Sequence, residues 1–129
     1  MSPVAWQRLE SAAVATAVLI ASIQLGFWWV WLLILFLLFD LGALGYLAGT
    51  RIGAATYNAV HSYVGPAVAA AVALLGAPDW VGLLALAWAF HVAVDRALGY
   101  GLKERDSFQH THLGWIGKAR AAARERGEP

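Results

Sequence analysis

Residues 27–46 read FWWVWLLILFLLFDLGALGY. No charged residue precedes Asp40 in this stretch, and most of its side chains are large and apolar. A helix needs about 20 apolar residues to cross a hydrocarbon core of about 30 Å. The stretch therefore predicts a membrane-spanning helix that carries one carboxylate within apolar sequence.

The composition of the whole chain favours the same class. Of its 129 residues, 60% are hydrophobic and 13% are charged, whereas about a quarter of the residues in a soluble domain are charged. The chain contains no cysteine, which excludes disulfides, thiol catalysis and cysteine-ligated metal centres. Its net charge of +1 provides no field that attracts nucleic acid, so we expect no nucleic-acid partner.

Four apolar stretches approach the length needed to span a bilayer. They predict helices over residues of about 6–25, 27–46, 52–75 and 79–99. We therefore predict an all-α polytopic membrane protein. Residues 1–114 would form a compact four-helix transmembrane bundle with a histidine-containing cytoplasmic segment, and residues 115–129 a basic tail. This tail is either a short surface helix held by anionic lipid or a solvated end.

The boundary between the first two helices admits two interpretations. Residues 11–39 also fit one long, tilted helix, which would bury three tryptophans in hydrocarbon. A turn at Gly26 instead places Trp28, Trp29 and Trp31 at the membrane interface, where tryptophan is enriched. We favour the turn for this reason.

The basic residues predict the orientation of the bundle. With four spans, those that flank the helices lie on one side: Arg8, Arg51, Lys103, Arg105, Lys118, Arg120, Arg124 and Arg126. The positive-inside rule then places both termini in the cytoplasm. We expect a multi-pass protein of the bacterial inner membrane, with the lipid bilayer as its partner. A homo-oligomer is compatible with this arrangement.

Four ionisable residues fall inside the predicted spans, at Asp40, His61, His91 and Asp95. At 1.5 Å per residue, the first three lie about 10–13 Å from the cytoplasmic edge, on three different helices. Asp95 lies one helical turn from His91 on the same face. A charged residue at such depth costs on the order of 3 kcal/mol and usually faces a bundle interior or a partner. We therefore expect these side chains to meet in one layer.

Other polar residues extend this layer. Tyr57 and Asn58 precede His61 by four and three residues, which places them on the same helix face. Arg96 follows Asp95 and points about 100° away from it around the helix. His110 and His112 lie after the last span, where a segment folding back would bring them to the cytoplasmic mouth of the cluster.

Imidazoles and carboxylates in this number predict a site for a divalent metal such as Zn, Mn or Fe. The predicted metal ligands are His61, His91, Asp95, His110 and His112, with Tyr57 and Asn58 in support. A metal-bound water can act as a nucleophile near neutral pH. We therefore predict metal-assisted hydrolysis of a lipid-like or phosphorylated substrate, in which Asp40, Asp95 and Arg96 are the catalytic residues and Arg51 or Arg96 meets an anionic group.

Two other functions use the same residues. Asp and His side chains that protonate in turn also serve a proton- or cation-coupled carrier, which at this length would need a dimer. Alternatively, the polar layer only sets helix register in a structural accessory subunit.

Several motifs resemble a bacterial integral-membrane family catalogued as domain of unknown function 4260. The resemblance covers residues 9–114 and rests on residues 39–49 (FDLGALGYLAG), Gly53, Tyr57, Asn58, His61, 91–96 (HVAVDR), 99–103 (GYGLK) and 111–114 (THLG). Where the family pattern usually has proline before the first aspartate, this chain has Phe39. The resemblance implies that the chain is a membrane protein and that these polar residues are typical of the family. It implies no activity, because none is established for the family. A fainter similarity to membrane-bound metal-dependent hydrolases is an analogy only.

Overall fold

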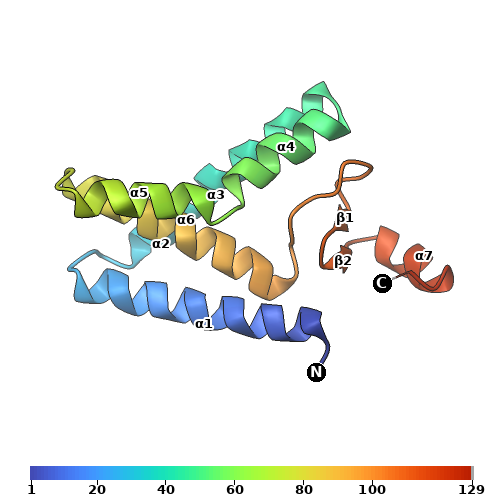
Figure 1. The fold of residues 1–129 in the computed structure, drawn as a ribbon, viewed down its shortest axis with the longest axis horizontal. Helices are drawn as coiled ribbons and strands as arrows, with labels where there is room; N and C mark the ends of the chain where they lie inside the picture. Colours follow the sequence, from blue (N-terminus) through green and yellow to red (C-terminus); the bar gives the residue numbers. More distant parts are fainter. Residues whose placement is uncertain (129) are drawn as a thin grey trace.

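The computed structural model describes residues 1–128 and is mostly helical (Figure 1). Its elements are α1 (Pro3–Gln24), α2 (Val30–Ile34), α3 (Phe36–Phe39), the 3-10 helix η1 (Asp40–Ala48), α4 (Thr50–Val60), α5 (Val64–Leu74), α6 (Asp79–Leu98), β1 (His110–Thr111), β2 (Gly114–Trp115) and α7 (Ala119–Glu125). The all-α class is confirmed. The only departure in the described chain is the short antiparallel hairpin of β1 and β2.

The central element is α6, which packs against α1, α2, α3 and α5 (Figure 1). A small core of Leu32, Phe39 and Ala87 forms where these helices meet. Many large apolar side chains instead point outward, among them Leu37 and Leu74. Such an exposed apolar surface is typical of helices that face lipid.

Three helical stretches are long and apolar enough to cross a membrane, namely Pro3–Gln24, Val30–Ala48 and Asp79–Leu98. The second of these combines α2, α3 and η1. These stretches indicate a membrane protein, as the composition predicts.

The boundary that the sequence left open, between one helix and two, is settled at Gly26. Helix α1 ends at Gln24, and Gly26 turns the chain with a φ of 82°. The next helix, α2, begins at Val30. Residues 11–39 therefore form separate helices, with Trp28 and Trp29 exposed beside the turn.

The stretch expected as one helix over residues 52–75 is interrupted. It forms α4 and α5, each of 11 residues, and neither is long enough to cross a hydrocarbon core of about 30 Å by itself. The reason is Pro66, which has no N–H and whose ring would clash with the carbonyl four residues earlier in a continuous helix. In the observed structure Pro66 lies in the first turn of α5, where no donor is needed.

Side chains from α6 bind the backbone at this interruption. The indole Nε1 of Trp88 donates to the carbonyl of Val60, and Arg96 Nη2 donates to the carbonyl of His61 at 3.5 Å. Irregular backbone within apolar surroundings needs such partners, because lipid offers none. The break between α4 and α5 is therefore tied to α6.

We expect Gly65→Ala to destabilise this junction. A Cβ at Gly65 would collide with the ring of Trp88, and overpacking of this kind costs about 1–3 kcal/mol. Unfolding of detergent-solubilised protein should start at a lower temperature. The matched control is Gly82→Ala in α6, where the nearest atoms to a new Cβ are 3.8 and 3.9 Å away. A Gly65→Ala protein as stable as the Gly82→Ala protein would contradict the packing described here.

Helix η1 and α4 form an antiparallel hairpin that turns at Gly49, with a φ of 112°. A Cβ at Gly53 would collide with the ring of Tyr46, and one at Gly45 with Thr56. These glycines let the two helices approach closely. The base of this hairpin brings Asp40 and His61 towards α6.

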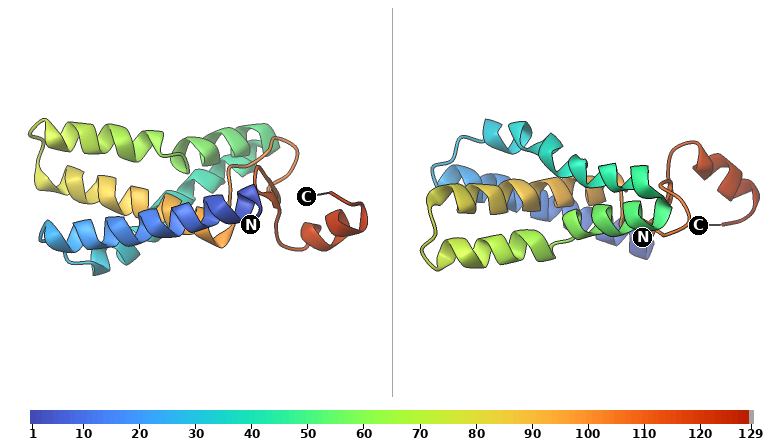
Figure 2. Two further views of the ribbon diagram at one scale, coloured as in Figure 1. Left: turned by 60° about the horizontal axis from the view of Figure 1, so that its bottom comes forward. Right: turned by 90° about the horizontal axis from the view of Figure 1, so that it is seen from above.

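Residues 100–128 lie together at one end of the helices (Figure 2). Asn58 fastens this segment to α4, because its Nδ2 donates to the carbonyl of Lys103 at 2.9 Å and its Oδ1 accepts from the Lys103 N–H at 2.6 Å. The tail expected from residue 115 onward contains the short helix α7.

Candidate metal centre

Four side chains that can ligate a metal meet where the base of the η1 and α4 hairpin contacts α6. They are Asp40, His61, His91 and Asp95, and one ligand atom from each lies within 4.8 Å of all the others. Asp40 begins η1, His61 caps the end of α4, and the other two lie one turn apart on α6. The layer of polar side chains that the sequence predicts is therefore present as one cluster.

The spacing of these atoms is that of a small coordination sphere. The two Nε2 atoms of His61 and His91 are 2.9 Å apart. Asp40 Oδ1 is 3.7 Å from each of them, and Asp95 Oδ2 is 3.4 Å from His61 and 3.6 Å from His91. Tetrahedral zinc, with bonds of about 2.0–2.2 Å, separates its ligand atoms by about 3.3–3.6 Å. A divalent metal fits among these atoms with small adjustments.

The orientation of His61 follows from the end of α4. Its Nδ1 lies 2.9 Å from the carbonyl oxygen of Tyr57, and a carbonyl can only accept, so Nδ1 carries the proton. A neutral imidazole has one N–H, which leaves the Nε2 lone pair directed at the cluster. The Tyr57 ring stacks on His61 at 3.6 Å between centroids. A histidine held through its other nitrogen by a backbone carbonyl is the usual arrangement at metal sites.

His91 is held by apolar packing. Its side chain is fully buried beside the rings of Phe36 and Phe39, at centroid distances of 4.4 and 5.5 Å. Within the described chain its Nδ1 has no hydrogen-bond partner. Its Nε2 contacts His61, Asp40 and Asp95 on the side of the cluster.

The two carboxylates differ in their surroundings. Asp95 is 13% exposed and accepts a long hydrogen bond of 3.4 Å from the hydroxyl of Tyr57, whereas Asp40 is 48% exposed. Among residues 1–128, no Lys or Arg nitrogen lies within 4.0 Å of either carboxylate. Two neighbouring negative charges beside neutral imidazoles favour a cation between them.

A cavity of about 390 Å³ opens beside the cluster, and Asp40 and Asp95 line it together with Lys103 and Phe108. Lys103 is only 4% exposed, and its ammonium lies 4.0 Å from the ring centroid of Phe108. Burial lowers the pKa of the Lys103 ammonium to about 8, and the charge of Asp95 opposes this shift. The cavity therefore has carboxylates on one wall and a buried amine on another.

In the sequence, Lys103 counts only among the basic residues that set orientation, so its place in the site was missed. The useful signal was Asn58, an amide on the face of His61, because its two hydrogen bonds to the Lys103 backbone position this residue. Asn58 thus supports the cavity, and Tyr57 contacts two members of the cluster, His61 and Asp95, directly.

The structure does not bring the two later histidines to the cluster. His110 Nδ1 pairs with Asp106 at 2.8 Å and its ring stacks on Trp115. His112 Nδ1 accepts the N–H of Leu102 at 2.8 Å. The β1 and β2 hairpin holds both histidines on the C-terminal segment, so the predicted ligand set reduces to His61 and His91 with the carboxylates.

The two arginines expected near an anionic group also lie elsewhere. Arg96 stacks over the ring of Tyr63 at 4.7 Å and binds the carbonyl at the α4 and α5 break. Arg51 lines a different cavity, beside Asn58 and His112. Lys103 is the basic residue that lines the cavity of the cluster.

Comparison with known proteins gives a family but no function. No curated protein and no solved structure matches the chain. The family model for a domain of unknown function (DUF4260) matches residues 4–116, which include the whole cluster, Lys103 and all the apolar helices. This match confirms the resemblance carried by the sequence motifs, and the chain belongs to the DUF4260 family.

Proposed function

We propose that this protein is a membrane metalloenzyme that holds one divalent metal at the Asp40, His61, His91 and Asp95 cluster and hydrolyses a phosphorylated, lipid-like substrate. The observation that carries the proposal is the convergence of four ligand atoms from three elements within 4.8 Å. Two imidazole nitrogens with carboxylate oxygens suit Zn, Mn or Fe.

The different exposure of the two carboxylates supports a division of roles. His61, His91 and the largely buried Asp95 would be the three protein ligands, which is the number that catalytic zinc sites use while keeping one position open. Asp40 is half exposed on the cavity side. It is placed to accept a proton from an attacking water as the general base. A metal bound here would supply a water with a pKa of about 7.

The residues that line the cavity favour a substrate that is both anionic and amphiphilic. The Lys103 ammonium would bind a phosphate oxygen, since Lys103 is the basic residue in the lining of the cavity. Phe108 and Ala43 provide apolar surface beside it. Under the predicted orientation, with both termini in the cytoplasm, this cavity would face the cytoplasmic side of a bacterial inner membrane.

The proposal is tested on detergent-purified wild-type protein. We expect about one zinc, manganese or iron ion per chain by elemental analysis. We also expect hydrolysis of phosphatidate in mixed micelles that stops on chelation and returns with Zn²⁺ or Mn²⁺. Protein purified without chelators that holds no metal and takes up none would overturn the proposal. A rate of phosphate release that a chelator does not change would overturn the catalytic part.

A proton relay is the second candidate, favoured by the contiguous polar atoms of Tyr57, Asp95, His61 and His91. This chain of polar atoms ends at His91 Nδ1, which has no partner within residues 1–128, and His91 lies against Phe36. A relay needs a continuous path on both sides of the site. Proton flux into vesicles that ceases in His61→Gln, in protein without bound metal, would favour the relay over the metalloenzyme.

A further inference from the structure

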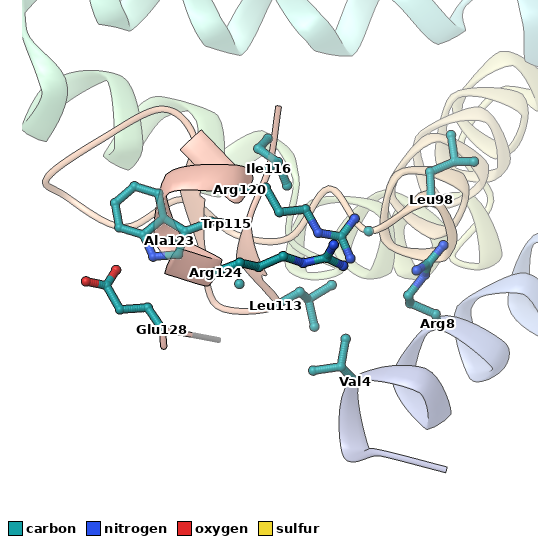
Figure 3. A pocket seen from close by; sticks show the side chains of 12 residues that line it. Val4, Arg8, Leu98, Leu113, Trp115, Ile116, Arg120, Ala123, Arg124 and Glu128 are labelled. Atoms are coloured by element: carbon teal, nitrogen blue, oxygen red, sulfur yellow. The ribbon is translucent and has the colours of Figure 1, made fainter. Parts of the chain in front are cut away.

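A second cavity, of about 250 Å³, is lined by residues from the start of α1, the end of α6, the β2 segment and α7 (Figure 3). Its lining shares no residue with the cavity beside the metal cluster. Three arginines line it, Arg8 from α1 and Arg120 and Arg124 from α7. We call this cavity the arginine pocket.

Within the described part of the chain, the guanidinium groups of the arginine pocket have no acidic partner of their own. Among residues 1–128, none of the three guanidinium groups has a carboxylate within 4.0 Å. The acidic residue in the lining is Glu128, and Arg126 binds both of its carboxylate oxygens, at 2.7 and 3.1 Å. Like charges brought together repel each other, so the arrangement favours a bound anion.

The free donors of these arginines point into one space. Arg8 Nε donates to the carbonyl of Ala97 at 2.9 Å, which fixes this side chain at the end of α6 and leaves its two Nη groups available. In the part of the chain that the structure describes, Arg120 and Arg124 make no side-chain hydrogen bond. In Figure 3 the side chains of Arg120 and Arg124 extend from α7 in the direction of Arg8, and all three line the arginine pocket. The planar fork of a guanidinium matches the oxygens of a phosphate.

The apolar part of the arginine pocket indicates where the anion comes from. Val4 and Leu98 line it and are 38% and 62% exposed. Both belong to helices that are long and apolar enough to cross a membrane, and both lie at the ends of those helices. Phosphate donors beside exposed apolar side chains at the end of a span correspond to the level of lipid headgroups.

We propose that the arginine pocket binds the phosphate of an anionic phospholipid, whose acyl chains lie against the exposed apolar side chains of α1 and α6. The bound phosphate joins α7 to the start of α1 by neutralising Arg8 together with Arg120 and Arg124. This lipid is a structural ligand, separate from any substrate at the metal cluster.

The test uses full-length protein in detergent, with lipid retention measured by native mass spectrometry. Wild-type protein is expected to retain one phosphatidylglycerol in preference to phosphatidylcholine. In Arg120→Gln/Arg124→Gln the affinity for phosphatidylglycerol should fall by at least about tenfold, because removing one charge-assisted hydrogen bond weakens binding by about a factor of ten. The same lipid should raise the melting temperature of the wild type and leave that of the double variant unchanged.

The matched control is Lys118→Gln/Arg105→Gln, which removes the same charge from residues outside the arginine pocket. This variant should lose much less affinity for phosphatidylglycerol than Arg120→Gln/Arg124→Gln, because neither Lys118 nor Arg105 lines the arginine pocket. The proposed lipid site would be overturned if both double variants lost affinity equally. It would also be overturned if the wild type retained phosphatidylcholine as well as phosphatidylglycerol. Stabilisation of the wild type by inorganic phosphate alone would overturn the lipid as the source of the phosphate. Metal content is measured in the same variants and should be unchanged in all of them. The result for the lipid site is then independent of the result for the metal centre.

Discussion

His91→Ala is expected to lower the affinity of the protein for Zn²⁺ by more than about 100-fold. Changing only the partners that orient a ligand already costs about 10–100-fold, and His91 Nε2 belongs to the cluster itself. Titration against a competing chelator measures the affinity. At a free Zn²⁺ concentration of 100 times the dissociation constant, the metal adds about 2.7 kcal/mol to the free energy of unfolding. His91→Ala should lack this stabilisation.

His110→Ala is the control for this experiment, because His110 pairs with Asp106 and not with the cluster. It should bind Zn²⁺ like the wild type. His91 is fully buried, so its truncation leaves a cavity and could unfold the protein. A circular dichroism spectrum shows whether the variant is folded, and His61→Gln provides a second ligand variant with a smaller change in volume. Wild-type zinc affinity in folded His91→Ala and His61→Gln would contradict the metal centre.

Asp40→Asn and Asp95→Asn are expected to have different effects. Asp40 is half exposed and lines the cavity, so Asp40→Asn should keep the metal and lower the rate of phosphate release by about 10²–10⁴-fold, as expected for loss of a general base. Asp95 is largely buried and is bound by the hydroxyl of Tyr57. Asp95→Asn should lose the metal and with it the activity.

The two measurements are metal content by elemental analysis and hydrolysis of phosphatidate at saturating Zn²⁺. Tyr57→Phe serves as a further comparison, because it removes only the 3.4 Å contact to Asp95 and should weaken zinc binding by about tenfold or more. If Asp40→Asn loses the metal as completely as Asp95→Asn, all four side chains are ligands. The site would then be closed and structural.

Most of the candidate site was predictable from the sequence because charged residues in apolar stretches are costly. Asp40, His61, His91 and Asp95 stand out for this reason, and the rise of a helix places them at similar depth. The same reasoning failed for His110 and His112. Outside a spanning helix no periodicity sets the direction of a side chain, and here a short hairpin and a pair with Asp106 determine it.

The break between α4 and α5 also could not be placed from hydropathy alone. Pro66 was visible in the sequence, but hydropathy measures only how apolar a stretch is, so residues 52–75 resembled one span. The break places the imidazole of His61 at the end of α4, with its Nδ1 bound to the Tyr57 carbonyl and its Nε2 facing α6. A local steric rule thus decides the orientation of a candidate metal ligand.

By itself, the sequence indicated the class of the protein and the four polar residues that gather inside it. Apolar length and scarce charge depend on composition, which tertiary contacts do not change. Only the tertiary structure decided which polar side chains meet. It placed Lys103, and not Arg96, in the lining of the cavity beside the cluster, and it brought arginines of α1 and α7 to one pocket. The physical reason is that such contacts join residues far apart in the chain, whose meeting depends on how helices pack and where loops are fastened.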